Sequence, residues 1–179
     1  MNRNKRDAIN NLALDIRKEL NLTTPVDIEK VPSRLGGMLL YEDELEYEAS
    51  VEKAGGKNFI IKILKNVDFP PERIRFSIAH ELGHLFLHMG YLINPSLWNT
   101  VKDYKDSVYY RYGHSSEEYE ANEFAAAFLM PKDEFLTVAK ENLDNGYYNT
   151  FKIAERFGVS EDAARNRGRW LGIFSWDKG

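Results

Sequence analysis

Residues 73–88 read Arg-Ile-Arg-Phe-Ser-Ile-Ala-His-Glu-Leu-Gly-His-Leu-Phe-Leu-His and contain the strongest pattern in the chain. The apolar spacing predicts a helix over about 71–89, with prolines in its first turn and a glycine at its end. His80 and His84 are four residues apart, so their imidazoles lie about 40° apart around the helix and can bind one metal ion. Glu81 is rotated by about 100°, which disfavours ligation but suits a general base that accepts a proton from water.

Because His-Glu-x-x-His also occurs in helices by chance, its surroundings matter. Leu82 and Leu85 lie on one side of the predicted helix, and Phe76 and Leu87 flank the histidines on the other. A helix that is apolar nearly all round is buried, and buried ionisable groups must be paired or ligated. These surroundings favour metal ligation, and Gly83 indicates that another backbone approaches the helix closely.

A third metal ligand must be His, Asp or Glu, because the chain has no cysteine. A second predicted helix, about Ser116 to Met130, begins with four candidates: Glu117, Glu118, Glu120 and Glu123. Glu117 and Glu118 fall within its apolar arc, whereas Glu120 and Glu123 fall outside it and are predicted to be solvated. Glu118 is favoured because Asn122, one turn further along, can hold a ligand in place. The alternative for Glu118 is a capping box with Ser115.

The other two histidines are candidates for the cleft around this site. His88 lies one turn beyond His84, but a third position along the axis drifts past a single ion, so His88 is predicted to be a neighbour rather than a ligand. His114 precedes the second helix and could line the cleft or be ordinary surface. The tyrosine-rich stretch 91–114 lacks periodicity and is predicted to be a long loop that helps to form the substrate cleft.

The remaining patterns predict an α+β fold, a small antiparallel sheet on a mostly helical core. An amphipathic helix is expected over 5–20, and strands are expected at Met38–Tyr41, about 47–51 and Phe59–Leu64. Further helices are expected near 132–142, 150–157 and 161–171. The length favours a single domain over 1–179, with a catalytic core at about 22–131 and a C-terminal helical segment at about 132–173.

Composition excludes several classes of protein. The chain has 179 residues and a net charge of −4, which makes direct nucleic-acid binding an unlikely main function. No leader pattern or long apolar run is present, so we expect a cytoplasmic protein with no membrane contact. Two histidines and a carboxylate suit Zn²⁺, although Mn²⁺ or Fe²⁺ fit the same ligands.

Residues 73–88, followed by Glu-Tyr-Glu-Ala-Asn-Glu-Phe-Ala-Ala-Ala-Phe-Leu-Met-Pro at 118–131, resemble the ImmA/IrrE family of metallo-endopeptidases. The resemblance covers about 58–131 and implies a zincin-like fold, with His80, His84 and Glu118 as metal ligands and Glu81 as general base. It also implies site-specific cleavage of a helix-turn-helix repressor or a cognate regulatory protein, in phage, mobile-element or stress regulation. Such a repressor is therefore the expected partner.

Residues 151–171 read as helix, glycine turn, serine cap and helix, which resembles a helix-turn-helix with Arg165, Arg167 and Arg169 along its second helix. The alternative is a helical hairpin packed on the core through five apolar residues: Ile153, Phe157, Val159, Ala163 and Trp170. This segment contains five basic and three acidic side chains. So small an excess of positive charge favours packing over DNA binding. Two function classes follow: a metal-dependent endopeptidase, or a DNA- or protein-binding regulator (toxin–antitoxin-like) with a structural or inactive metal site.

Overall fold

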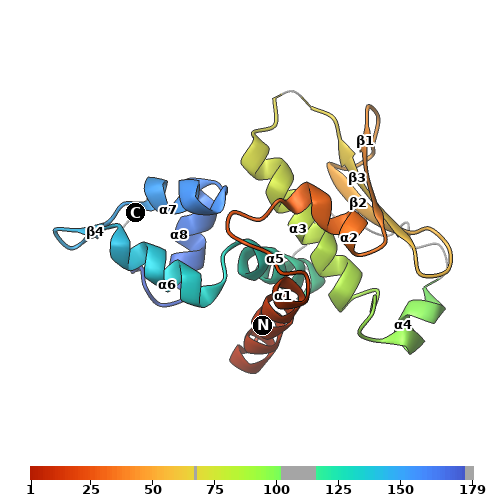
Figure 1. The fold of residues 1–179 in the computed structure, drawn as a ribbon, viewed down its shortest axis with the longest axis horizontal. Coiled ribbons are helices and arrows are strands. Elements are labelled where there is room, and N and C mark those ends of the chain that lie inside the picture. Colours follow the sequence, from red (N-terminus) through yellow and green to blue (C-terminus); the bar gives the residue numbers. More distant parts are fainter. Residues whose placement is uncertain (67, 102–115, 176–179) are drawn as a thin grey trace.

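A computed structural model describes residues 1–66, 68–101 and 116–175. Two long helices, α3 (Pro71–Leu87) and α5 (Ser116–Leu129), cross near the middle of the molecule (Figure 1). Both follow the predicted bounds: α3 has Pro71 in its first turn, and α5 ends before Pro131. A Cβ atom on Gly83 would lie 2.9 Å from the Cα of Ala121. The predicted close approach is therefore confirmed, and α5 is the partner.

The sheet packs against α3 but is not antiparallel throughout. It consists of β1 (Met38–Glu42), β2 (Ala49–Lys53) and β3 (Phe59–Leu64), in the order β1-β3-β2. β2 runs antiparallel to β3, whereas β1 runs parallel to it. The prediction of a small antiparallel sheet is thus wrong in β1, because β3 inserts between the two earlier strands instead of following them in a meander.

In β3 every second side chain is buried, as expected for a strand with one face on the core, and Phe59, Ile61 and Ile63 are fully buried. The remaining N-terminal elements cover the central helices. They are α1 (Arg3–Glu19), the short 3₁₀ helix η1 (Ile28–Lys30) and α2 (Val31–Arg34). α1 packs on α5 through Ile9 and Ala13, as its amphipathic pattern predicts.

One short helix was not predicted. α4 (Pro95–Thr100) lies within the stretch 91–114 that was expected to be a loop. Asn94 caps it by accepting a hydrogen bond from the Leu97 amide, and Trp98 anchors it by burial. Six residues give too little periodicity for a helix to be recognised. Residues 102–114 of the predicted loop, including His114, lie outside the described residues.

The C-terminal segment forms a group of helices beside α5 (Figure 1). Its elements are α6 (Lys132–Glu141), β4 (Leu143–Asp144), β5 (Tyr147–Tyr148), α7 (Thr150–Phe157) and α8 (Glu161–Trp170). The three helices confirm the prediction, whereas the two-residue strands were not expected. Gly158 connects α7 to α8 in a left-handed conformation with φ 63°, and its carbonyl accepts a hydrogen bond from Arg75 of α3.

Two details of this segment correct the sequence analysis. Ala164, not Ala163, is the fully buried alanine of α8, and Trp170 is 52% exposed. Arg167 is buried, so the three arginines of α8 do not form a solvated row for a DNA backbone. The packing alternative described the hairpin better, because Ile153, Phe157 and Val159 are buried in the core. No helix among the described residues has the length and apolar character needed to cross a membrane.

Candidate metal centre

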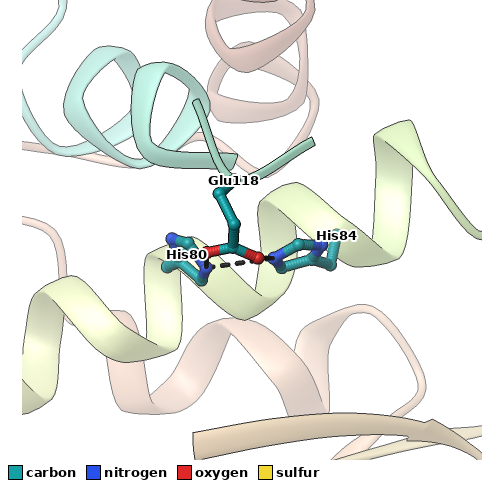
Figure 2. A group of neighbouring side chains, drawn as sticks. All are labelled: His80, His84 and Glu118. Atoms are coloured by element: carbon teal, nitrogen blue, oxygen red, sulfur yellow. Dashed lines mark hydrogen bonds and ion pairs between the residues drawn. The ribbon is translucent and has the colours of Figure 1, made fainter. Parts of the chain in front are cut away.

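Three predicted site residues converge between α3 and α5. His80 and His84 project from α3, and Glu118 reaches them from the first turn of α5 (Figure 2). The Nε2 atoms of the two histidines are 3.0 Å apart. Glu118 Oε2 lies 3.3 Å from His80 Nε2, and Glu118 Oε1 lies 3.2 Å from His84 Nε2. Residues that are 34 positions apart in the chain thus present one nitrogen–nitrogen–oxygen group.

These distances test whether a metal ion fits. Ligands of a tetrahedral Zn²⁺, at bonds of roughly 2.0–2.2 Å, are separated from one another by about 3.3 Å. The separation of 3.0 Å between the two Nε2 atoms, and the distances of 3.2 and 3.3 Å from these atoms to one oxygen each of Glu118, are close to that spacing. The donor set, two imidazoles and one carboxylate without thiolate, is also one that zinc accepts with a position left open. The residues therefore fit a divalent metal ion.

Asn122 determines which nitrogen of His80 faces this group. Its Oδ1 lies 3.0 Å from His80 Nδ1. A carbonyl oxygen can only accept a hydrogen bond, so the proton of neutral His80 resides on Nδ1 and the lone pair on Nε2 points at the ligand group. The structure thus brings the predicted supporting residue into contact with His80, rather than with Glu118 as expected from the helix face.

His84 has a different support. Its Nδ1 lies 2.9 Å from Nδ1 of His88, so His88 is a neighbour of the ligand group and lies outside the three converging donors. His88 Nε2 lies 3.5 Å from Glu120 Oε2, and Lys5 of α1 forms an ion pair with the same glutamate. His84 is 1% exposed, which leaves it almost no contact with bulk water.

The prediction that Glu120 and Glu123 are solvated is wrong. Their exposed fractions are 6% and 7%. Glu123 forms ion pairs with Arg6 of α1 and Arg167 of α8, the latter at 3.0 Å. Because α1 packs on α5 and Arg167 of α8 reaches Glu123, faces of the helix that its own periodicity marks as polar are covered. The adjacent basic pair Lys5 and Arg6 was the only sequence signal for these partners.

Electrostatics within the group favour a carboxylate beside imidazoles. Burial opposes ionisation of Glu118, but hydrogen bonds from His80 and His84 outweigh burial and lower its pKa to about 2. Burial also opposes the charged form of His80, yet the nearby carboxylates of Glu118 and Glu81 leave its pKa raised. For His84, burial prevails and the pKa is lowered, which favours the neutral imidazole that a metal requires.

Glu81, the predicted general base, is 4% exposed. It lies close enough to His80 for its charge to raise the pKa of that imidazole, yet it is not one of the three converging donors. This placement agrees with its predicted rotation around α3. The capping-box alternative for Glu118 involves Ser115, which lies outside the described residues.

A cavity of about 870 Å³ lies between α3, α5 and α8, and His80, His84 and Glu118 are not among the residues that line it. Phe76, one helical turn before His80, and Asn122, which contacts His80, both line it. Ala163 and Trp170 of α8 line the far side. Sequence reasoning did not find this cavity, because the position of α8 depends on contacts that its local pattern does not encode.

Comparison with known proteins supports a family assignment. A family model described as Peptidase_M78, IrrE N-terminal-like domain, matches residues 62–168, which is more than half of the chain. No curated protein matches. Among solved structures, a Mycobacterium tuberculosis transcriptional regulator is similar with a TM-score of 0.59 and 16% sequence identity.

That similarity covers 90% of this chain but only 46% of the regulator, so the chain spans less than half of that protein. At this identity the likeness shows the fold alone. The α+β architecture and the matched range from β3 into α8 agree with the resemblance carried by the two helical motifs. The chain therefore belongs to the Peptidase_M78 family, whose characteristic domain is IrrE N-terminal-like.

Proposed function

We propose that this protein is a zinc-dependent endopeptidase in which His80, His84 and Glu118 hold the metal. The observation that carries the proposal is the convergence of the two Nε2 atoms, 3.0 Å apart, with the two carboxylate oxygens of Glu118, each 3.2–3.3 Å from one of these nitrogens. Membership of a metallopeptidase family supports the same conclusion. The absence of cysteine and the nitrogen–oxygen ligand set favour zinc, while Mn²⁺ or Fe²⁺ could occupy the same ligands.

A divalent metal in such a site polarises a substrate carbonyl and makes a water molecule more acidic. Glu81 is the general base of the proposed reaction. Its carboxylate accepts a proton from the attacking water and then delivers that proton to the amide nitrogen of the leaving peptide. Burial keeps Glu81 away from bulk water, and its position on α3 directly after His80 fixes it beside the ligand group.

The proposed substrate is a helix-turn-helix repressor or another cognate regulatory protein in the cytoplasm. The family resemblance supports this class of substrate. The cavity supports a polypeptide substrate, since it offers room for a peptide segment and is lined by Asn122, the residue that contacts His80.

The test compares the wild-type chain with Glu81→Gln, each loaded with Zn²⁺ and incubated with the helix-turn-helix repressor encoded next to its gene. We expect equal zinc content by elemental analysis, cleavage by the wild type, and a loss of at least about 100-fold in the variant. Equal cleavage by both proteins would contradict the role of Glu81. Zinc binding without cleavage, together with salt-sensitive binding of duplex DNA, would support a regulator instead.

A further inference from the structure

His84 and His88 present facing Nδ1 atoms, and the ligand group alone does not determine which of the two carries the proton. His84 Nδ1 and His88 Nδ1 are 2.9 Å apart, a hydrogen-bond distance. A hydrogen bond between two neutral imidazoles needs a proton on one nitrogen and a lone pair on the other. The pair therefore has two arrangements. His84 donates in one and His88 donates in the other.

The two arrangements differ in what His84 presents to the ligand group. If His84 donates from Nδ1, its Nε2 carries the lone pair, which faces His80 and Glu118 and can bind a metal. If His88 donates instead, the proton of His84 resides on Nε2 and the position is blocked. In that arrangement His88 Nε2 must also present a lone pair.

The surroundings of His88 favour the first arrangement, whereas Glu118 Oε1, 3.2 Å from His84 Nε2, attracts a proton to that nitrogen as long as no metal ion is bound there. His88 Nε2 is buried and makes no hydrogen bond within the described part of the chain, and Glu120 Oε2 lies 3.5 Å away. A lone pair facing a carboxylate at that distance is repelled, whereas an N–H is attracted. Glu120 is 6% exposed, so its negative charge is screened little by water, and its ion pair with Lys5 favours the ionised carboxylate.

We propose that Glu120 and His88 are positioning residues that fix His84 in its metal-binding tautomer. The carboxylate of Glu120 holds the proton of His88 on Nε2, which leaves His88 Nδ1 to accept the hydrogen bond from His84 Nδ1. The inference rests on the proposed metal site. By this inference, residues of α5 support both histidines. Asn122 contacts His80 directly, whereas Glu120 acts on His84 through the imidazole of His88.

Glu123 provides a matched control on the same helix. It is buried to the same extent as Glu120 and is likewise ion-paired, but its partners are Arg6, Arg167 and Asn10 rather than a histidine. Substituting either glutamate by glutamine removes one buried charge from α5. Only the change at position 120 should reach the metal site.

The first experiment reads the tautomer directly in the metal-free protein. The chain has only four histidines, so ¹⁵N-histidine NMR spectra can be assigned. We expect a larger fraction of His84 in the Nδ1–H form in the wild type and in Glu123→Gln than in Glu120→Gln, because a carboxamide can present either a carbonyl or an N–H to His88 and then no longer opposes the attraction of Glu118 for the proton of His84. Identical His84 shifts in all three proteins would overturn the proposal.

The second experiment measures zinc affinity by competition with a chelator. We expect roughly tenfold weaker binding in Glu120→Gln and between about 10-fold and 100-fold weaker binding in His88→Leu. His88→Gln should recover most of the affinity, since its oxygen can accept from His84 while its amide donates to Glu120. Glu123→Gln should bind zinc like the wild type.

Three results separate the possible failures. If the wild type does not bind zinc, the proposed function fails and this inference fails with it. If the wild type binds zinc but Glu120→Gln and His88→Leu bind equally well, only the positioning role fails. Should His88→Leu not fold, the pair Glu120→Gln and Glu123→Gln still decides, because weaker binding in both would show a merely structural effect.

Discussion

At the scale of single residues, Gly83 shows how one missing side chain sets the geometry of the proposed metal site. Glycine inside a helix costs about 1 kcal/mol relative to alanine. Here the backbone of Ala121 lies where a Cβ would be, with its Cα at 2.9 Å and its carbonyl oxygen at 3.1 Å. Because a backbone cannot rotate aside, any side chain would push α5 and Glu118 away from α3.

We therefore expect Gly83→Ala to destabilise the protein in spite of better helix propensity. Overpacking of a well-packed core costs about 1–3 kcal/mol, which exceeds the roughly 1 kcal/mol gained. Urea unfolding measures the stability, and chelator competition should show weakened zinc binding. Gly168→Ala is the control for overpacking away from the metal site, since its Cβ meets the ring of Phe174, which packs on Phe135 of α6 and Tyr148 of β5. Equal zinc affinity in Gly83→Ala and the wild type would contradict the argument.

Sequence reasoning predicted the residues of the proposed site where the information is local. His80, Glu81 and His84 share one helical turn, and the face of a second helix left Glu117 and Glu118, of which Glu118 was favoured because Asn122 lies one turn further along. The burial of Glu120 and Glu123 could not be predicted in this way. Their environment is created by Lys5 and Arg6 more than 100 positions earlier and by Arg167 more than 40 positions later, so no window on α5 contains the partners.

At the scale of elements, the long helices and β3 were predictable because apolar periodicity extends over enough residues. The parallel direction of β1 could not be predicted, because the residue pattern of each strand does not determine which strand it pairs with or in which direction. α8 illustrates the same division. Its serine cap is readable in the sequence, whereas its attachment to the rest of the molecule depends on Arg167, which donates to the Met130 carbonyl and Asn10 as well as to Glu123.

These two contributions to α8 should differ clearly in size. Ser160→Ala removes a cap in which the hydroxyl accepts from the Ala163 amide, so we expect a loss of about 1 kcal/mol. Arg167→Ala breaks a buried ion pair and should cost about 3–5 kcal/mol. The free energy of unfolding in urea compares them. A smaller loss in Arg167→Ala than in Ser160→Ala would show that α8 is held mainly by its own local structure.

At the scale of the whole molecule, the cavity lies between the C-terminal helices and Asn122, which contacts His80 of the proposed metal site. If a substrate segment occupies this space, filling it from α8 should impair cleavage without disturbing the ligand group. Ala163 lines the cavity, and Ala163→Trp would fill part of it, whereas Arg165 is exposed on the same helix and does not line it. We expect Ala163→Trp to lower kcat/KM for repressor cleavage by about tenfold or more, mainly through KM, with zinc content unchanged, and Arg165→Trp to behave like the wild type. Equal kcat/KM in the two tryptophan variants would place the substrate elsewhere, and would leave the C-terminal helices with a purely structural part in the molecule.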